Sequence, residues 1–173
     1  MTRIHSFKPI ANRSAEILIL GSMPGQASLT AGQYYAHPQN AFWRILSELL
    51  RIEATASYNV RVRALKLAQI AVWDVFHSCI RQGSLDSSIE TGTQAANDFR
   101  KFFRSHRKIT EVFFNGAKAE ACFKKHVLPE IAGASLNFTR LPSTSPAHAS
   151  LSFAEKRDAW RLILSRVTPS NLK

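Results

Sequence analysis

A short segment near the N-terminus holds residues suited to binding a planar, polar molecule. It begins with a glycine–proline turn made up of Gly21, Ser22, Met23, Pro24 and Gly25. Glycine lets the backbone approach a ligand closely, and proline stiffens the turn. Tyr35 follows, and a tyrosine ring can stack on a nucleobase with a gain of about 1–3 kcal/mol. Asn40 can both donate and accept hydrogen bonds, so it could read a base edge, hold a water molecule or cap the helix that begins near Phe42.

The glycine–proline turn does not have the spacing of a nucleotide-binding loop. It lacks the G-x-G-x-x-G pattern of dinucleotide folds, and no Lys-Ser or Lys-Thr follows it as in a P-loop. The 6 histidines show no metal-ligand spacing, and 2 cysteines are too few for a four-thiolate zinc site. We therefore expect neither a nucleotide cofactor nor a metal ion.

A second polar segment, LPSTSPAHAS, lies near the C-terminus. Its candidate DNA-contacting residues are Ser143, Thr144, Ser145, Pro146, Ala147 and His148. Serine and threonine hydroxyls, together with backbone N–H groups of loops, commonly bind phosphates. The chain has no G-x-S-x-G nucleophile elbow, so a Ser-His-Asp hydrolase is not indicated.

The charge of the chain favours a polyanionic partner. Lys and Arg number 23 against 12 Asp and Glu, which gives a formal net charge of +11 over 173 residues. Such an excess attracts nucleic acid and releases condensed counterions when phosphates are neutralised. No apolar run reaches the roughly 18 residues of a membrane helix, and the N-terminus shows no signal-peptide core. We expect a cytoplasmic, nucleoid-associated monomer that binds DNA and has no membrane partner.

Short apolar runs alternate with stretches of helical periodicity along the chain. The predicted strands are Ile17–Leu20, Ile70–Val75, Val112–Phe114 and Leu136–Leu141, and the predicted helices are Ala41–Leu50, Arg63–Gln69, Ala95–His106, Lys118–His126 and Phe153–Val167. This alternation predicts parallel βαβ units, hence an α/β protein built as a three-layer α/β/α sandwich with a central, mainly parallel four-stranded sheet. The length favours a single domain over residues 1–173, with its core at about 14–167.

Ligands of such sheets bind at the carboxyl ends of the strands. The loops after Leu20, Phe114 and Leu141 should therefore meet at one site, flanked by the loop after Val75. This placement brings three further candidates to the site, namely Asp74, Asn115 and Lys118. Asp74 could equally serve in the core or as a helix cap.

The order of the motifs GSMPG, YYAHPQNAFW, WDVFHSCIRQGSLDSSI, FFNGAKA and LPSTSPAHAS resembles the uracil-DNA glycosylase superfamily, and most closely its hypoxanthine-DNA (deoxyinosine) glycosylase family. The mismatch-specific uracil and thymine enzymes carry an asparagine in the turn that positions the attacking water, and Met23 stands at that position here. The resemblance therefore implies that Asn40 is the catalytic asparagine. It also implies that Tyr35 stacks under the flipped base, that Asn115 reads its edge, and that Ser143 replaces the histidine usual in the uracil enzymes.

The resemblance implies a monofunctional DNA glycosylase of base excision repair. Such an enzyme flips a deaminated base, here hypoxanthine above all, out of the duplex and hydrolyses its N-glycosidic bond. The loop 143–148 would hold phosphates, with Ala147 and His148 entering the gap left in the base stack. Two alternatives stay open: an enzyme of the same fold that removes uracil or mismatched thymine, and a DNA-binding module without catalysis.

Overall fold

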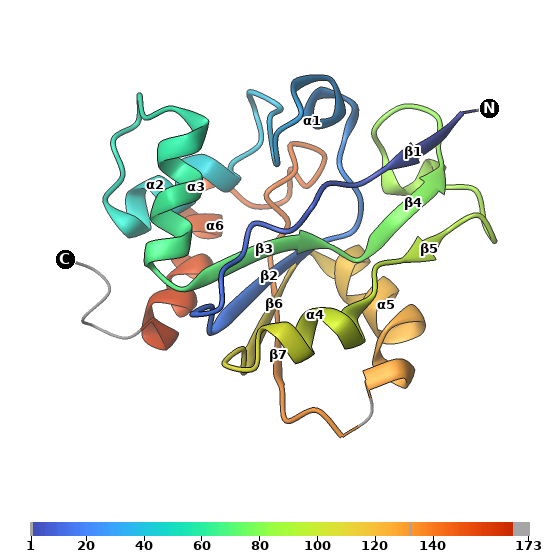
Figure 1. Cartoon of the computed structure of the whole chain (residues 1–173). Coiled ribbons are helices and arrows are strands. Elements are labelled where there is room, and N and C mark those ends of the chain that lie inside the picture. Colours follow the sequence, from blue (N-terminus) through green and yellow to red (C-terminus); the bar gives the residue numbers. More distant parts are fainter. Residues whose placement is uncertain (1, 132, 168–173) are drawn as a thin grey trace.

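The structure of the chain is a computed structural model that describes residues 2–131 and 133–167 (Figure 1). The predicted domain of residues 1–173 extends beyond these limits. The strands are β1 (Arg3–His5), β2 (Ile17–Gly21), β3 (Ile70–Asp74), β4 (Phe76–Ile80), β5 (Ala95–Ala96), β6 (Glu111–Asn115) and β7 (Asn137–Leu141). The α-helices are α1 (Gln26–Ala31), α2 (Phe42–Leu50), α3 (Tyr58–Leu67), α4 (Phe99–Ser105), α5 (Ala117–His126) and α6 (Phe153–Trp160). Short 3-10 helices are Asp86–Ser88, Leu128–Ile131 and Arg161–Arg166.

Four strands form a central parallel sheet in the order β3-β2-β6-β7. The strand β2 is paired on both sides, with Ile17 opposite Ile70 of β3 and Glu111 of β6. Every residue of β2 and β3 is buried, which is expected where helices cover both faces of a parallel sheet. The sheet confirms the predicted four-stranded, parallel centre.

Helices lie on both sides of the sheet and complete the three predicted layers. In Figure 1, α2, α3 and α6 lie together on one side, and α4 and α5 lie on the other. The helix α2 buries Phe42, Ile45 and Leu46 along one stripe, as an amphipathic helix does. Phe42 meets Trp160 of α6 edge to face, with ring centroids 5.8 Å apart. This aromatic contact fixes the start of α2 against the helix that follows the loop after β7.

A second, antiparallel sheet of β1, β4 and β5 is not predicted by the sequence reasoning. The expected loop after Val75 is instead the strand β4, because the chain stays extended past the end of β3. Val75 donates its N–H to the Gly21 carbonyl at 2.9 Å, and Phe76 donates to the Ser22 carbonyl at 3.1 Å. These two bonds continue the pairing of β2 and β3 into the glycine–proline turn, so the start of β4 is bonded directly to that turn.

Several helix limits also differ from the prediction. Ala95–Ala96 pair with β4 as the strand β5, and α4 begins only after Asp98, whose side chain caps the helix by accepting the Lys101 N–H at 2.9 Å. The helix α3 starts at Tyr58 rather than at residue 63, because Ser57 caps it in the same way. The helix α1 is not predicted at all, and the end of the last predicted helix tightens into a 3-10 turn.

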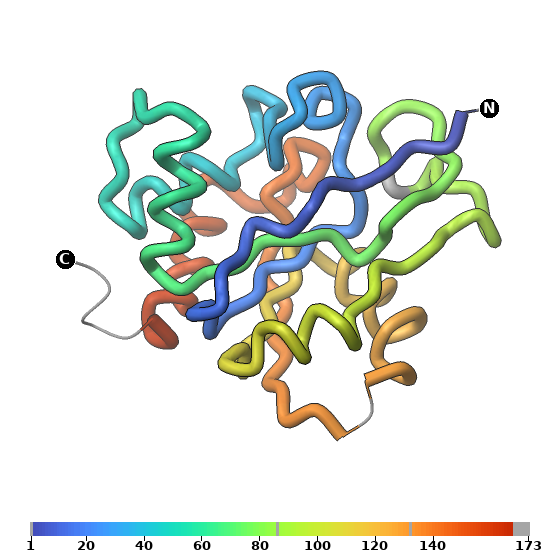
Figure 2. Tube along the Cα trace, viewed as in Figure 1, coloured from blue at the N-terminus to red at the C-terminus, as the bar shows by residue number. Residues whose placement is uncertain are grey.

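Three loops meet at the carboxyl edge of the central sheet, as predicted. Figure 2 shows the loop after β7, in orange-red, beside the segment that leads from β2 into α2, in blue and cyan. The Ala41 N–H donates to the Thr144 carbonyl at 3.0 Å and joins these two segments. None of the described helices has the length and apolar character needed to cross a membrane.

Candidate active site

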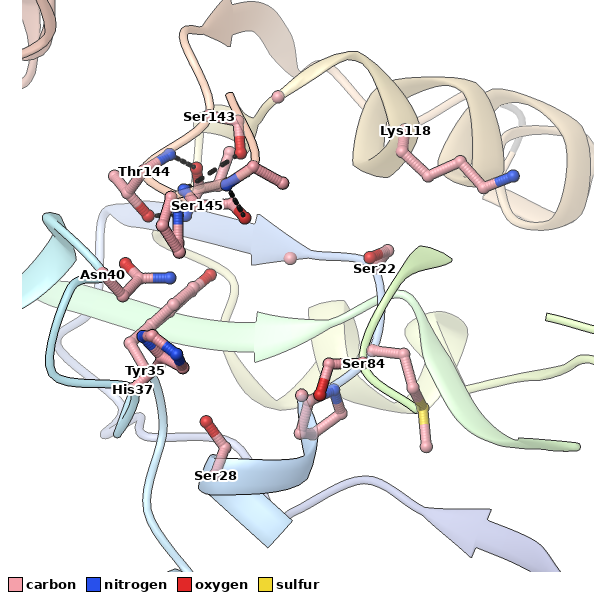
Figure 3. Close-up of a pocket in the computed structure, with 18 of the residues that line it drawn as sticks. Ser22, Ser28, Tyr35, His37, Asn40, Ser84, Lys118, Ser143, Thr144 and Ser145 are labelled. Atoms are coloured by element: carbon pink, nitrogen blue, oxygen red, sulfur yellow. Dashed lines mark hydrogen bonds between the residues drawn. The ribbon is translucent and has the colours of Figure 1, made fainter. Parts of the chain in front are cut away.

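The carboxyl edge of the central sheet carries a cavity of about 610 Å³ (Figure 3). Every residue predicted for the site lines this cavity, and these are Gly21, Ser22, Met23, Pro24, Gly25, Tyr35, Asn40, Asp74, Asn115, Lys118, Ser143, Thr144, Ser145, Pro146, Ala147 and His148. The structure thus brings the predicted residues together, while their individual roles stay predictions. Within residues 2–131 and 133–167, no cluster of three or more His, Cys, Asp or Glu side chains could hold a metal ion.

Asn40 lies half-buried in the cavity wall, just before α2. Its Oδ1 accepts the Phe42 N–H at 3.0 Å, but the N-cap of α2 is Ala41, so the predicted helix-cap role of Asn40 is wrong and the carboxamide bonds to the first turn from one residue before the cap. The Oδ1 contact fixes the side chain, while the bond from Ala41 to Thr144 fixes the backbone beside it. Among the described residues, the Nδ2 group of Asn40 has no hydrogen-bond partner. One end of the carboxamide is therefore anchored, and the donor end is available to a ligand or a water molecule.

Tyr35 is held in an uncommon backbone conformation. Its φ of 55° lies in the left-handed region, which costs a residue with a side chain on the order of 1–3 kcal/mol. Trp43 helps to impose this turn, because its Nε1–H donates to the Tyr34 carbonyl at 2.7 Å. The Tyr35 ring lies nearly parallel to the ring of Phe42, with centroids 3.8 Å apart and an angle of 19°. The strained backbone thus places an aromatic ring, supported by Phe42, in the cavity wall.

Asp74 contributes a buried carboxylate to the same wall. The residue is 3% exposed, and Ser6 donates its hydroxyl to Oδ2 at 2.9 Å. A Cβ atom on Gly21 would lie 2.5 Å from Asp74 Oδ1 and 2.9 Å from the Tyr35 hydroxyl oxygen. Glycine is therefore required at position 21 for these two groups to lie over the turn. Burial, and then the negative charge of Asp74, raises the pKa of Tyr34 above its ordinary value, so this phenol stays neutral at physiological pH.

A buried arginine that sequence reasoning misses holds the glycine–proline turn from behind. Arg81, 6% exposed, donates from Nη2 to the Pro24 carbonyl and from Nε to the Gly83 carbonyl, the latter at 3.0 Å. Nearby, Ser84 Oγ accepts the Gln26 N–H at 2.9 Å. The segment after β4 therefore bonds to the glycine–proline turn and holds it in place. The sequence analysis predicts only that this segment flanks the site, not that it makes these bonds.

Thr144 ties the loop after β7 to Asn115, the last residue of β6. Asn115 accepts the Thr144 N–H on Oδ1 and donates from Nδ2 to the Thr144 hydroxyl, both at 2.9 Å. Both ends of the Asn115 carboxamide are thus engaged within the protein. Gly116 allows this close approach: its φ is +95°, and a Cβ atom there would lie 2.9 Å from the Cβ of Ser143.

The loop 143–148 is also held from beneath by α6. Lys156, 5% exposed, donates from Nζ to the Ser145 carbonyl at 3.2 Å, and burial lowers the pKa of this lysine below its ordinary value. Pro146 and Ala147 are exposed at the tip of the loop. Lys118, exposed near the start of α5, lies apart from the serines of the loop in Figure 3. The loop therefore combines a fixed base with an accessible tip.

Residues 8–164 match the family model of the uracil DNA glycosylase superfamily, and the chain belongs to this superfamily. A protein from Methanosarcina barkeri named hypoxanthine DNA glycosylase is 38% identical over 114 residues, which cover 65% of this chain and 71% of the relative. A second protein of that name, from Methanosarcina acetivorans, is 34% identical over 143 residues, which cover 78% of this chain and 89% of the relative.

A solved structure supports the same assignment. A solution NMR structure from Methanosarcina acetivorans, provisionally described as a uracil DNA glycosylase, is similar to this chain with a TM-score of 0.76 and 30% sequence identity. The similarity covers 94% of this chain and 99% of the other. The predicted fold class and the predicted family are therefore confirmed, and the chain is a DNA glycosylase of this superfamily.

The fit between Gly116 and the loop after β7 yields a stability prediction. Gly116→Ala forces a side chain into a backbone conformation that glycine alone adopts readily, at a cost of about 1–3 kcal/mol, and adds a clash with Ser143. The free energy of unfolding, measured by urea denaturation, should fall accordingly. Gly133→Ala is the matched control, because the φ of Gly133 is +93° and no atom of the described residues lies within 4 Å of an added Cβ. Equal losses in the two variants would contradict the close packing at Gly116.

Proposed function

We propose that the protein excises deaminated bases from DNA, hypoxanthine above all, as a monofunctional glycosylase of base excision repair. The observation that carries the proposal is the placement of Asn40, whose free carboxamide donor lines the same cavity as the supported ring of Tyr35. The names of the two Methanosarcina relatives support the choice of base. Deamination converts adenine into hypoxanthine, which mispairs, so its removal prevents mutation.

The cavity suits a nucleobase that has been flipped out of the duplex. Its volume of about 610 Å³ falls within the range of sites for small organic ligands. Flipping costs a few kcal/mol, and stacking on Tyr35 offsets about 1–3 kcal/mol of it. Because Phe42 stacks on one face of the Tyr35 ring, the ring is already in position before a base stacks on its other face.

The base edge meets the glycine–proline turn and Asp74. Hypoxanthine carries an N–H on its six-membered ring where adenine has a bare nitrogen, and a carboxylate can accept that N–H. The buried Asp74 carboxylate and the peptide groups of residues 21–25 are therefore our candidates for base reading. The sequence suggests the same role for Asn115, but its carboxamide is bonded at both ends to Thr144, which favours holding the loop instead.

Bond cleavage passes through an oxocarbenium-like sugar. Asn40 holds a water molecule, whose oxygen bonds to C1′ as the bond from C1′ to the base nitrogen breaks. One proton of the water stays on the new hydroxyl and the other ends on the departing base. Met23, at the position where the mismatch-specific enzymes carry asparagine, offers no amide for this task. Lys118 is the one lysine among the described residues that line the cavity, and it is exposed, which favours hydrolysis without strand cleavage.

A second candidate is removal of uracil or mismatched thymine, which the name of the superfamily and of the solved relative favours. A base-release panel with duplexes carrying inosine, uracil, xanthine or mismatched thymine tests the choice. We expect alkali-labile abasic sites to form fastest on the inosine duplex. Faster release of uracil or thymine would establish the second candidate, and DNA binding without any abasic site would indicate a non-catalytic module. Monomeric action and a cytoplasmic, nucleoid-associated location stay predictions from the sequence.

Asn40→Ala should lower base release from an inosine duplex by about 100-fold or more, because removing one preorganised hydrogen-bond donor from an active site costs on that order. DNA binding should persist, since the loop 143–148 is unchanged. Single-turnover assays measure the first quantity and fluorescence anisotropy the second. Loss of the hydrogen bond to the Phe42 N–H also costs about 0.5–1.5 kcal/mol of stability. Asn40→Ser supplies an acceptor oxygen for the Phe42 N–H without the amide, so it should regain stability but not turnover. Retained turnover in either variant would contradict the assignment.

Lys156→Met should impair the enzyme on duplex DNA more than on single-stranded DNA. Without the ammonium, the Ser145 carbonyl loses its partner and the loop loosens, which matters where the loop must replace a base in the stack. A hydrogen bond to a charged group supports an effect of about tenfold on the ratio of duplex to single-strand rates. Lys125→Met, exposed on α5, removes the same charge away from the loop. If Lys156→Met slows both substrates equally, the loop is not the element that opens the duplex.

A further inference from the structure

A second cavity, of about 410 Å³, adjoins the first and has no part in the reaction proposed above. It lies between the segment before α2 and the helices α2 and α3. Tyr35, His37 and Asn40 line both cavities. Two of these residues, Tyr35 and Asn40, are assigned to the flipped nucleotide, so the second cavity borders the proposed base site. The phosphates on either side of a flipped nucleotide are its neighbours along the strand, so one of them can reach the second cavity when the base occupies the first.

The walls of the second cavity carry a positive charge. Arg44 of α2 and Arg61 of α3 both line it. Glu48 is the acidic residue among the described residues of the wall, and Arg157 pairs with its carboxylate at 3.4 Å. Arg157 pairs with Asp158 as well as with Glu48, and within the wall the two arginines outnumber the one described acidic residue. An anionic ligand is therefore favoured over a neutral one.

Arg44 is arranged as phosphate-binding arginines are. Its guanidinium carbon lies 3.7 Å from the centroid of the Phe153 ring, so stacking fixes the plane of the group. The side chain is exposed, and among the described residues it has no hydrogen-bond or ion-pair partner. A fixed guanidinium with open N–H groups matches the two oxygens of a phosphodiester. Arg61 is held differently, since its Nη2 donates to the Ala54 carbonyl at 3.1 Å.

We propose that the second cavity binds the phosphate adjacent to the flipped nucleotide on the damaged strand, with Arg44 as the main ligand and Arg61 beside it. The site rests on the proposed entry of the base into the first cavity. This site acts before the bond is cleaved. Binding this phosphate fixes the DNA backbone on one side of the lesion, while the loop 143–148 holds the DNA backbone at another point. The nucleotide between the two points is then constrained to leave the stack.

The binding test uses a duplex with a stable abasic-site analogue, which no glycosylase can cleave. Arg44→Gln should weaken binding about tenfold, as expected for a lost charge-assisted hydrogen bond. The slope of log K against log salt concentration should fall by about one, because one phosphate contact is lost. Arg61→Gln should act in the same direction. Arg63→Gln is the matched control, because Arg63 is exposed on α3 and does not line the cavity; an equal change in this variant would overturn the proposal.

A neutral methylphosphonate, placed in turn at each phosphate on either side of the analogue, locates the contact. At one phosphate next to the analogue, the substitution should weaken binding of the unaltered protein as much as Arg44→Gln does. The same substitution should cause no further loss in Arg44→Gln, because the interaction is already absent. If the two losses multiply at every position, Arg44 does not bind an adjacent phosphate.

The base-release panel keeps this proposal separate from the proposed function. A phosphate effect on the abasic analogue without release of any base would sustain the phosphate site and reject the glycosylase chemistry. Release of hypoxanthine, together with methylphosphonate and Arg44→Gln losses that multiply at every position, would sustain the glycosylase chemistry and reject the phosphate site.

Discussion

Thr144 fastens three separate stretches of the chain at one point. Its backbone and hydroxyl meet both ends of the Asn115 carboxamide, and its carbonyl accepts the Ala41 N–H. The residue is 1% exposed, so these bonds lie in a low-dielectric region where each satisfied polar group is strongly held. Through them, the end of β6, the loop after β7 and the segment carrying Asn40 share one geometry. A site that must hold groups within about 0.5 Å depends on such a junction.

A column of aromatic rings extends this rigidity from the cavity into the core. Tyr35 stacks on Phe42, and Phe42 meets Trp160 edge to face. The strained φ of Tyr35 is maintained because Tyr34 and Phe42 beside it are buried, and because the Tyr34 carbonyl is bonded to Trp43. At the other wall, Gly21 leaves room for the Asp74 carboxylate to lie over the backbone. The cavity is thus shaped by packing and by the absence of one side chain.

The parts predicted well from the sequence are those set by local pattern. Apolar runs such as Ile17–Leu20 predict buried parallel strands, and the order of strands and helices then predicts which loops converge. The missed strand β4 follows β3 with only Val75 between them, so no turn signal marks it as a separate element. Its partners β1 and β5 are short, and pairing with them depends on tertiary structure.

The predicted site residues meet because the sheet topology brings their loops together, but their bonding partners could not be foreseen. Nothing in the sequence indicates that Asn115 uses both ends of its side chain on Thr144, or that Arg81 supports the Pro24 carbonyl. Each of these pairs joins segments far apart along the chain. For Asn40, the sequence suggests a helix cap, a base reader or a water-holding group. The N-cap is Ala41 instead, and Asn40 Oδ1 bonds to the Phe42 N–H while the Nδ2 donor stays available for either of the other roles.

The helix that follows the loop 143–148 begins with a reciprocal pair of caps. Ser152 and Glu155 bond to each other's backbone N–H groups, at 3.3 and 2.7 Å, and Lys156 reaches back to the loop from the next position. A loop fixed in this way has already lost its conformational entropy when the chain folds. The DNA contact proposed for this loop therefore demands little further ordering of the protein. In the proposed function, the conformational cost of engaging a lesion then falls mainly on the DNA, which must unstack the flipped nucleotide.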